Sequence, residues 1–294
     1  MKDKSKLIEI ISNYYKPPFN QLLIDEIKKS IRIKSSENKE IKIGDTKLGG
    51  VPHLPIEVEW PKDSKSGKHY IFVTQINLKQ IESYNLEKKL PEEGILYFFV
   101  SQDHWDDGVV VFEKEIKNIE IKTPPIEVTN EKKNFFQKIF NLKGHKVLLK
   151  EYGVEIFNEY HIPSQDSLQI EKILKTKNLI KTPRNIMKEE VYENGLLYDD
   201  DENDMTANHH LLGNYNGIQN EYYQLNLIDS KTRTKKLTLN EINQALEWEL
   251  LMQIDSDNML DLNWGDSGKI YFFIHKEDLK NQRFNKVKII GECY

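Results

Sequence analysis

The sequence predicts an α+β protein in which one sheet-forming unit occurs twice, with a pseudo-twofold relation, within one compact body. Short apolar runs bounded by Gly, Pro and Asp predict strands, and a likeness between the two ends of the chain, preserved in order, predicts an internal duplication. Helical spacing near the N-terminus predicts a helical pair in front of the sheet. We divide the chain into N-terminal helices packed on the body (residues 1–35) and a single domain (36–294) with repeat 1 (about 41–125), a connecting region (126–204) and repeat 2 (about 205–294).

The N-terminal residues have the spacing of amphipathic helices. One helical face carries the apolar side chains of Leu7, Ile10, Ile11 and Tyr14. Pro17 and Pro18 end this helix. A second helical face is predicted from Leu23, Ile24, Ile27 and Ile31. We expect both helices to pack on the body, because amphipathic helices usually serve cores.

The sequence pattern of repeat 1 is typical of β-strands. Residues 71–76 and 95–100 are apolar on both faces and predict interior strands of a covered sheet. Residues 77–84 between them predict a short helix, and residues 109–112 and 119–121 predict further strands.

The connecting region gives weaker signals. Residues 134–142 and 167–175 have helical spacing, and residues 146–157 contain strand-like stretches. The acidic run at residues 199–204 predicts a solvated surface loop.

Repeat 2 opens with a turn-rich stretch at residues 209–223. Thr238 and Glu241 then have the spacing of a capping box, which predicts the start of a helix. Residues 249–254 and 269–274 predict strands.

Three matched segments define the repeat. They pair Lys47-Leu-Gly-Gly-Val-Pro52 with His210-Leu-Leu-Gly-Asn-Tyr215, the strand that contains Gln75 with the strand that contains Gln253, and Gly94-Ile-Leu-Tyr-Phe-Phe99 with Gly268-Lys-Ile-Tyr-Phe-Phe273. A buried amide must satisfy two donors and two acceptor lone pairs. Gln75 and Gln253 are therefore expected to bond the backbone of a neighbouring loop or, alternatively, a ligand. The first is favoured because buried polar side chains mostly bond backbone.

Longer motifs identify a family. The chain contains Lys47-Leu-Gly-Gly-Val-Pro-His-Leu-Pro55, Thr74-Gln-Ile-Asn77, Glu249-Leu-Leu-Met-Gln-Ile-Asp-Ser-Asp257 and Asn263-Trp-Gly-Asp-Ser-Gly-Lys-Ile-Tyr-Phe-Phe-Ile274. On these motifs the chain resembles the YwqG-like family (DUF1963), a bacterial domain of unknown function. The resemblance covers about residues 41–125 and 205–294. It implies an α+β fold with an internal duplication and no established activity, and it suggests an immunity-type protein that binds a toxin partner as one alternative.

Acidic side chains gather after the second Gln-bearing strand. Asp255, Asp257 and Asp266 offer oxygen ligands of the kind that calcium and magnesium prefer, so a metal-assisted enzyme is a second alternative. The EF-hand template fails, because Leu260 occupies the position that requires glycine. Loop capping through Asx-turns explains the cluster about as well as metal binding does.

Two further motifs could carry chemistry or binding. Gly265-Asp-Ser-Gly268 resembles the nucleophile segment of serine proteases, but Lys269 follows it and no spacing supports a triad, so we expect a turn and no catalytic residue. Trp60 and Trp264 are expected in loops, where they either seal the ends of the core or serve as binding platforms.

Composition narrows the function class. The net charge of −5 and the pI of about 6.0 argue against a nucleic-acid or anionic-membrane partner. Cys293 is the single cysteine, which fits a reducing, cytoplasmic compartment. We therefore favour a non-catalytic binding or protein-interaction module, whose partner is an unknown protein or small molecule. The sequence assigns no cofactor, and a divalent cation is the weaker alternative. The expected site of the module is the cleft where the repeats meet, lined by Gln75, Gln253, Trp60, Trp264, Asp255, Asp257 and Asp266.

Overall fold

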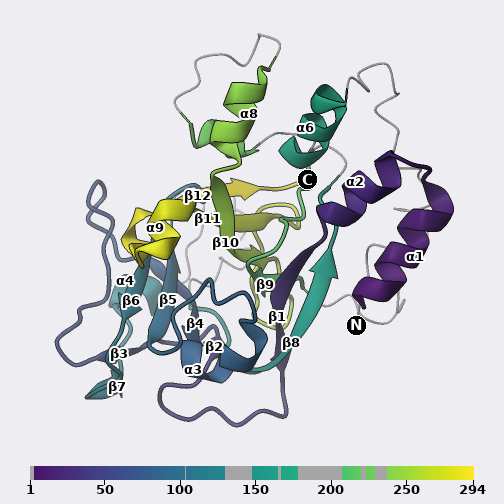
Figure 1. Cartoon of the computed structure of the whole chain (residues 1–294). Helices are drawn as coiled ribbons and strands as arrows, with labels where there is room; N and C mark the ends of the chain where they lie inside the picture. The colour runs from purple at the N-terminus through teal and green to yellow at the C-terminus, as the bar shows by residue number, and fades with distance from the viewer. Residues whose placement is uncertain are drawn as a thin grey trace.

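The computed structural model describes residues 3–102, 104–129, 148–164, 167–177, 207–219, 223–228 and 237–294. Its main feature is one ten-stranded sheet (Figure 1) in which all paired neighbours are antiparallel. The strand order is β12 (Lys288–Glu292), β11 (Lys269–His275), β10 (Trp248–Asp255), β9 (His209–Leu211), β1 (Lys28–Ser36), β8 (Tyr152–His161), β2 (Lys47–Leu48), β4 (Ile71–Asn77), β5 (Ile95–Val100) and β6 (Gly108–Glu113). A separate two-stranded sheet pairs β3 (His53–Pro55) with β7 (Ile119–Ile121). The mixed α+β class predicted from the sequence is confirmed.

The N-terminal segment contains two helices and then a strand. The first helix, α1 (Lys4–Tyr14), begins where the Asp3 side chain accepts a hydrogen bond from the Ser5 N–H. The second helix, α2 (Phe19–Asp25), ends before residue 28, so the prediction of a helix through Ile31 is wrong. Ile31 and Ile33 instead alternate with Arg32 along β1, and this period of two buries both isoleucines in the barrel-like interior.

Strands β4, β5, β6 and β7 form where the apolar runs of repeat 1 predicted them. Between β4 and β5, the short helix α3 (Leu78–Ile81) and the 3-10 turn η1 (Glu82–Tyr84) confirm the predicted helical segment, and the Asn77 side chain caps it. A further short helix, α4 (Ile126–Thr129), follows β7.

In the connecting region, β8 confirms strand structure within residues 146–157 and extends beyond it. Helix α6 (Leu168–Thr176) begins at Ser167, whose hydroxyl accepts from the Ile170 N–H, and confirms the predicted helical spacing. The helix expected at residues 134–142 and the acidic loop at residues 199–204 lie outside the described residues.

Repeat 2 contains the predicted capped helix and both predicted strands. The Thr238–Glu241 capping box makes both of its hydrogen bonds and starts α8 (Leu239–Ala245), and β10 and β11 follow. The stretch expected to consist of turns begins with β9 and includes the 3-10 turn η2 (Tyr223–Asn226). Helix α9 (Lys276–Lys280) and the 3-10 turn η3 (Phe284–Lys286) lead into β12, which the sequence analysis did not predict.

The ten-stranded sheet is curled and nearly closed, with a shared core inside it. On β5, Leu96, Phe98 and Val100 face this core, and on β11 the equivalent interior set is Ile270, Phe272 and Ile274. The intervening side chains of the same strands belong to two other clusters, one around Trp60 and one around Tyr215. Both strands are therefore buried on both faces, as the apolar run at residues 95–100 predicted for β5.

The two edge strands, β6 and β12, come close to each other. A Cβ added at Gly108 on β6 would lie 2.7 Å from Ile289 Cδ1 on β12. Just before β12, the ring of Phe284 in η3 lies 5.0 Å from that of Phe112 on β6. Among the described residues no hydrogen-bonded ladder joins β6 to β12, so the barrel-like sheet stays open at this place.

The helices cover the remaining apolar surfaces. Helices α1 and α2 lie beside β1 and β8 in Figure 1, and their apolar side chains share a cluster with Ile162, Ile170 and Ile173. Helix α6 also contacts α8 through Leu168, Ile242 and Ala245. Within the described ranges, no helix has the length and apolar character that a membrane crossing requires.

Candidate functional site

Gln75 lies fully buried on β4 and bonds the backbone of two nearby segments. Its Oε1 accepts from the His53 N–H at 2.8 Å, and its Nε2 donates to the Asp45 carbonyl at 2.7 Å. The Tyr97 hydroxyl donates to the His53 carbonyl at 2.6 Å. The amide therefore holds the loop that leads into β3 on the outer side of the sheet.

Gln253 on β10 has the same kind of environment. Its Oε1 accepts from the Asn216 N–H at 2.9 Å, and its Nε2 donates to the Asn208 carbonyl at 2.9 Å. The Tyr271 hydroxyl lies 2.7 Å from the Asn216 carbonyl. Strands β2, β8, β1 and β9 stand between β4 and β10 in the sheet, so the structure does not bring Gln75 and Gln253 to one cleft.

Lys47 and His210 hold the turns that follow β2 and β9. The Lys47 ammonium is fully buried, donates to the Val51 carbonyl at 2.5 Å and contacts Glu151 at 2.6 Å. Burial lowers the pKa of Lys47, although Glu151 acts in the opposite direction. His210 Nε2 donates to the Asn214 carbonyl at 3.2 Å, since a carbonyl can only accept.

His53 follows the Gly49-Gly50 turn and is held neutral. The Gly44 N–H donates to His53 Nδ1 at 3.0 Å, which leaves Nε2 as the protonated nitrogen of the neutral ring. Burial and the neighbouring Lys47 ammonium lower the pKa of His53 to about 4.

Asp257 is buried in a polar cluster with His209 and Ser35. The Asp255 N–H donates to His209 Nδ1 at 3.1 Å, so the proton is on Nε2, which donates to Asp257 Oδ2 at 3.2 Å. Ser35 Oγ donates to the same carboxylate oxygen at 3.2 Å. Burial raises the pKa of Asp257, but the bonds from His209, Met259 and Ser35 outweigh it and lower the pKa overall. Because serine and histidine both bond the carboxylate, histidine does not stand between them as a nucleophilic triad requires.

The other two carboxylates of the predicted acidic set lie apart from Asp257. Asp255 accepts from the Asn208 N–H at 3.0 Å and is 4.0 Å from the Lys269 ammonium, whereas Asp266 is exposed in the turn before β11. No group of three or more His, Cys, Asp or Glu side chains in the described part of the chain could hold a metal ion.

The two candidate tryptophans are both buried, in different clusters. Trp60 belongs to the outer cluster of repeat 1, and its Nε1 donates to the Tyr70 carbonyl at 2.8 Å. Trp264 belongs to the interior core, packs against Trp105 at 6.4 Å between ring centroids, and its Nε1 has no hydrogen-bond partner among the described residues. They do not form a shared platform.

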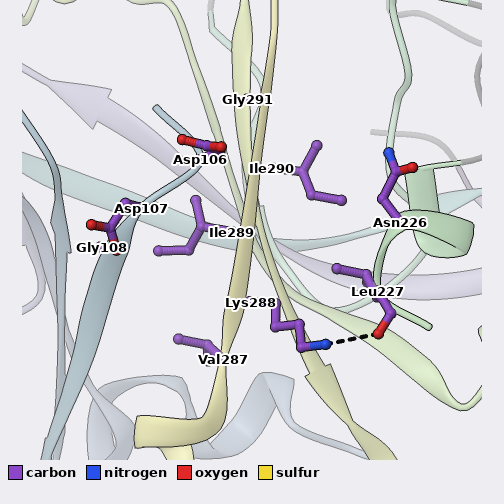
Figure 2. A pocket seen from close by; sticks show the side chains of 10 residues that line it. All are labelled: Asp106, Asp107, Gly108, Asn226, Leu227, Val287, Lys288, Ile289, Ile290 and Gly291. Atoms are coloured by element: carbon purple, nitrogen blue, oxygen red, sulfur yellow. Dashed lines mark hydrogen bonds between the residues drawn. The ribbon is translucent and has the colours of Figure 1, made fainter. Parts of the chain in front are cut away.

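A groove lies instead along the free edge of β12, and we call it the β12 groove. Its volume is about 510 Å³, and Figure 2 shows its lining residues, which are Asp106, Asp107, Gly108, Asn226, Leu227, Val287, Lys288, Ile289, Ile290 and Gly291. In this view Ile289 points toward Asp107 and Gly108, and Ile290 points toward Asn226. The groove thus has two walls, one on each side of β12. One wall contains Ile289 and the acidic residues Asp106 and Asp107, and the other contains Ile290, Leu227 and Asn226.

The backbone of β12 offers unused hydrogen-bonding groups to this groove. The Ser256 N–H donates to the Gly268 carbonyl, so the alternating ladder of β10 and β11 directs the N–H and C=O groups of Ile270 and Phe272 toward β10 and those of Lys269, Tyr271 and Phe273 toward β12. The β12 partners of these three residues are Glu292, Ile290 and Lys288, which leaves the N–H and C=O groups of Ile289 and Gly291 facing away from β11. The Gln219 side chain already donates to the next outward carbonyl, that of Cys293, at 2.5 Å. The free edge is therefore capable of further pairing at Ile289 and Gly291.

The β12 strand is held firmly at its end. The Glu292 carboxylate accepts hydrogen bonds from the hydroxyls of Tyr223 and Tyr271 and from the N–H groups of Ile218 (2.8 Å) and Gln219 (3.0 Å). Four donors on one buried carboxylate fix both the strand and the loop beside it.

The sequence analysis missed the β12 groove. Its signal was the short run Val287-Lys-Ile-Ile-Gly291 after a helix, which has strand propensity but too few residues for a clear period. Asp107 and Gly108 belong to repeat 1, far from β12 in the sequence, and no spacing connects them to Ile289.

Comparison with family models identifies the family of this chain. The family model described as Domain of unknown function (DUF1963) matches residues 46–293, which include both Gln-bearing strands and the β12 groove. Comparison with curated proteins gives no match. Because the family model covers most of the sequence, the chain belongs to the family of this domain of unknown function, as its motifs indicated.

Proposed function

We propose that this protein is a non-catalytic binding module whose ligand docks in the β12 groove. The observation that carries the proposal is an open sheet edge that is also hollowed, with a volume of about 510 Å³ between residues of repeat 1 and repeat 2. Binding sites are typically concave, with apolar side chains and a few polar groups in their lining. This groove is concave, and its lining combines isoleucines and Leu227 with the polar side chains of Asp106, Asp107, Asn226 and Lys288.

The buried polar side chains with chemical potential support the same proposal. Gln75 and Gln253 bond loop backbone, Lys47 bonds a turn, and His209 and Asp257 bond each other. Their hydrogen-bonding capacity is used inside the scaffold, which favours a structural role for them.

We also infer that repeat 1 and repeat 2 are two copies of one unit, related by a pseudo-twofold axis. The strand order supports this inference, since β2-β4-β5-β6 on one side corresponds to β9-β10-β11-β12 on the other, with β1 and β8 between them. The backbone supports it as well. Gly49 (φ 65°) and Leu212 (φ 59°) occupy the same turn position, and their N–H groups donate to Val73 and Leu251 respectively. On this view the β12 groove is the place where the two copies meet without pairing.

A cytoplasmic location fits this proposal. It rests on the single cysteine, Cys293, which is free.

The proposal can be tested with a library of small-molecule fragments, using ligand-observed NMR on the full chain. Ile290→Trp should fill the groove, and Ile290→Val is the matched control that keeps it open. Fragments that bind wild type and Ile290→Val but not Ile290→Trp would support the site, provided that thermal denaturation shows all three proteins folded. Fragment binding that is indifferent to Ile290→Trp, or no binding at all, would contradict it.

A further inference from the structure

We infer that the natural occupant of the β12 groove is an extended peptide segment that carries a basic side chain and adds as a strand to β12. This inference rests on the proposed function and names the chemical class of its ligand. It follows from the backbone of β12, from the shape of its two walls and from the charges along them.

The backbone argument concerns the free edge. Peptides that add to a sheet gain affinity from main-chain hydrogen bonds, and they gain specificity from pockets for alternate side chains. Ile289 and Gly291 present outward N–H and C=O groups at a spacing of two residues, which matches the repeat of an extended strand.

The walls explain why the added segment should be extended. On one side of the edge lie Gly108 and Ile289, and on the other lie Leu227 and Ile290 (Figure 2). Alternate side chains of a strand point to opposite faces, so successive residues of a bound peptide would enter the two sides in turn. A peptide in this position would also have β6 on its far side, where the sheet is now open.

The charged residues of the groove favour a basic side chain in the ligand. Asp106 is exposed and Asp107 half-buried in the wall formed by the loop before β6, and the ion pairs found among the described residues involve neither of them. Asp107 accepts one hydrogen bond, from the Tyr70 hydroxyl at 3.4 Å. The one lysine that lines the groove is engaged on the opposite wall. Its ammonium donates to the Leu227 carbonyl at 2.8 Å and lies 4.6 Å from the centroid of the Trp248 ring. An arginine or lysine of the ligand can therefore pair with the Asp106 carboxylate, beside the Asp107 carboxylate that Tyr70 also bonds, and no described lysine or arginine lines that wall.

The experiment uses a phage-displayed library of random seven-residue peptides, selected on the full chain. We expect enriched peptides to combine apolar residues with Lys or Arg at a fixed position. Replacing both wall carboxylates (Asp106→Asn with Asp107→Asn) should weaken their binding roughly threefold to tenfold, an effect that added salt reduces. Asp266→Asn is the matched control, because it neutralises an exposed carboxylate outside the groove and should leave binding unchanged.

Strand addition has a signature that simple surface binding lacks. A selected peptide should slow amide hydrogen exchange at Ile289 and Gly291, whereas the Ile290 amide already faces β11 and should change little. N-methylation at alternate peptide positions should abolish binding, and N-methylation at the intervening positions should not.

Several outcomes would overturn the inference. Enriched peptides without a basic residue, affinity unchanged by the double Asn variant, or protection away from β12 would each contradict it. Protection of Ile289 and Gly291 that rises with protein concentration in the absence of peptide would assign the edge to a second copy of this chain. If fragments occupy the groove but no peptide is enriched, this inference fails while the proposed function stands.

Discussion

The rings of Phe98 and Phe272 meet edge to face in the interior of the sheet, with their centroids 5.1 Å apart and their planes at 83°. Each is the middle residue of a Tyr-Phe-Phe run, one on β5 and one on β11. Both side chains are fully buried in the shared core. The two lateral parts of the sheet are therefore packed against each other through the middle residues of these two Tyr-Phe-Phe runs.

This contact should give a measurable coupling energy. We expect Phe98→Leu and Phe272→Leu each to destabilise the fold, and the double variant to lose less than the sum of the two. The difference should be about 0.5 to 1.5 kcal/mol, the range found for aromatic pairs. Urea denaturation of the four proteins of the cycle measures it, and strictly additive losses would show that the rings do not interact.

The two glutamines should have similar energetic importance. Gln75→Met and Gln253→Met keep the side-chain volume but leave one backbone N–H and one carbonyl without their partner. Each change should lower the free energy of unfolding by roughly 2 to 4 kcal/mol. Equilibrium unfolding in urea tests this prediction. A large loss for one variant together with a negligible loss for the other would argue against equivalent roles.

Acid should destabilise the protein through His53. Its pKa is about 4 in the folded protein and near 6.5 when unfolded, so the unfolded chain binds more protons between these values. The free energy of unfolding should therefore fall as the pH decreases from about 6.5 to about 4, by up to about 3 kcal/mol from this residue. His53→Asn retains an acceptor for the Gly44 N–H and should flatten the dependence.

The control for this pH series is the exposed His104. His104→Asn should leave the wild-type pH dependence of the unfolding free energy intact. A His53→Asn protein with the same slope as wild type between pH 4 and 6.5 would rule out His53 as its origin.

The two buried tryptophans should respond differently to loss of the indole N–H. Trp60→Phe leaves the Tyr70 carbonyl without its donor, whereas Trp264→Phe removes an Nε1 that bonds no described residue. Both changes remove a similar apolar volume, so the difference isolates the hydrogen bond. We expect Trp60→Phe to cost about 1 kcal/mol more than Trp264→Phe, as measured by thermal or urea denaturation. Equal losses would indicate that the Trp60 bond contributes nothing.

Local patterns predicted most of the elements that have a clear period or a cap. The apolar runs at residues 71–76 and 95–100 and the Thr238–Glu241 box carry their information within a few neighbouring residues, and each produced the expected strand or helix. The sequence predicts a helix that runs into the first residues of β1, because Leu23, Ile24, Ile27 and Ile31 fit a period of 3.6. The period of two that belongs to β1 itself has only two buried isoleucines. Propensity in this segment was overridden by pairing with β8 and β9.

The candidate site was harder to predict from the sequence than the fold. Sequence analysis singled out buried amides, carboxylates and tryptophans because their chemistry is conspicuous, and the structure places most of them in hydrogen bonds or in the core. The β12 groove depends on backbone groups at Ile289 and Gly291 and on their proximity to Gly108. The amino-acid types of an edge strand do not indicate which of its backbone N–H and C=O groups are unpaired, so only the three-dimensional structure reveals them.

The position of β1 also has a consequence for biosynthesis. Strands β4, β5 and β6 can form as successive hairpins, and so can β10, β11 and β12, whereas β1 pairs residue 28 with residue 161 and residue 31 with residue 211. During synthesis, β4, β5 and β6 can thus pair early. Strand β1 keeps both edges unpaired until β8 and β9 have left the ribosome. We expect the time that β1 remains unpaired to determine the need for a chaperone and the yield of soluble protein. The stability of the β4-β5-β6 and β10-β11-β12 units should matter less.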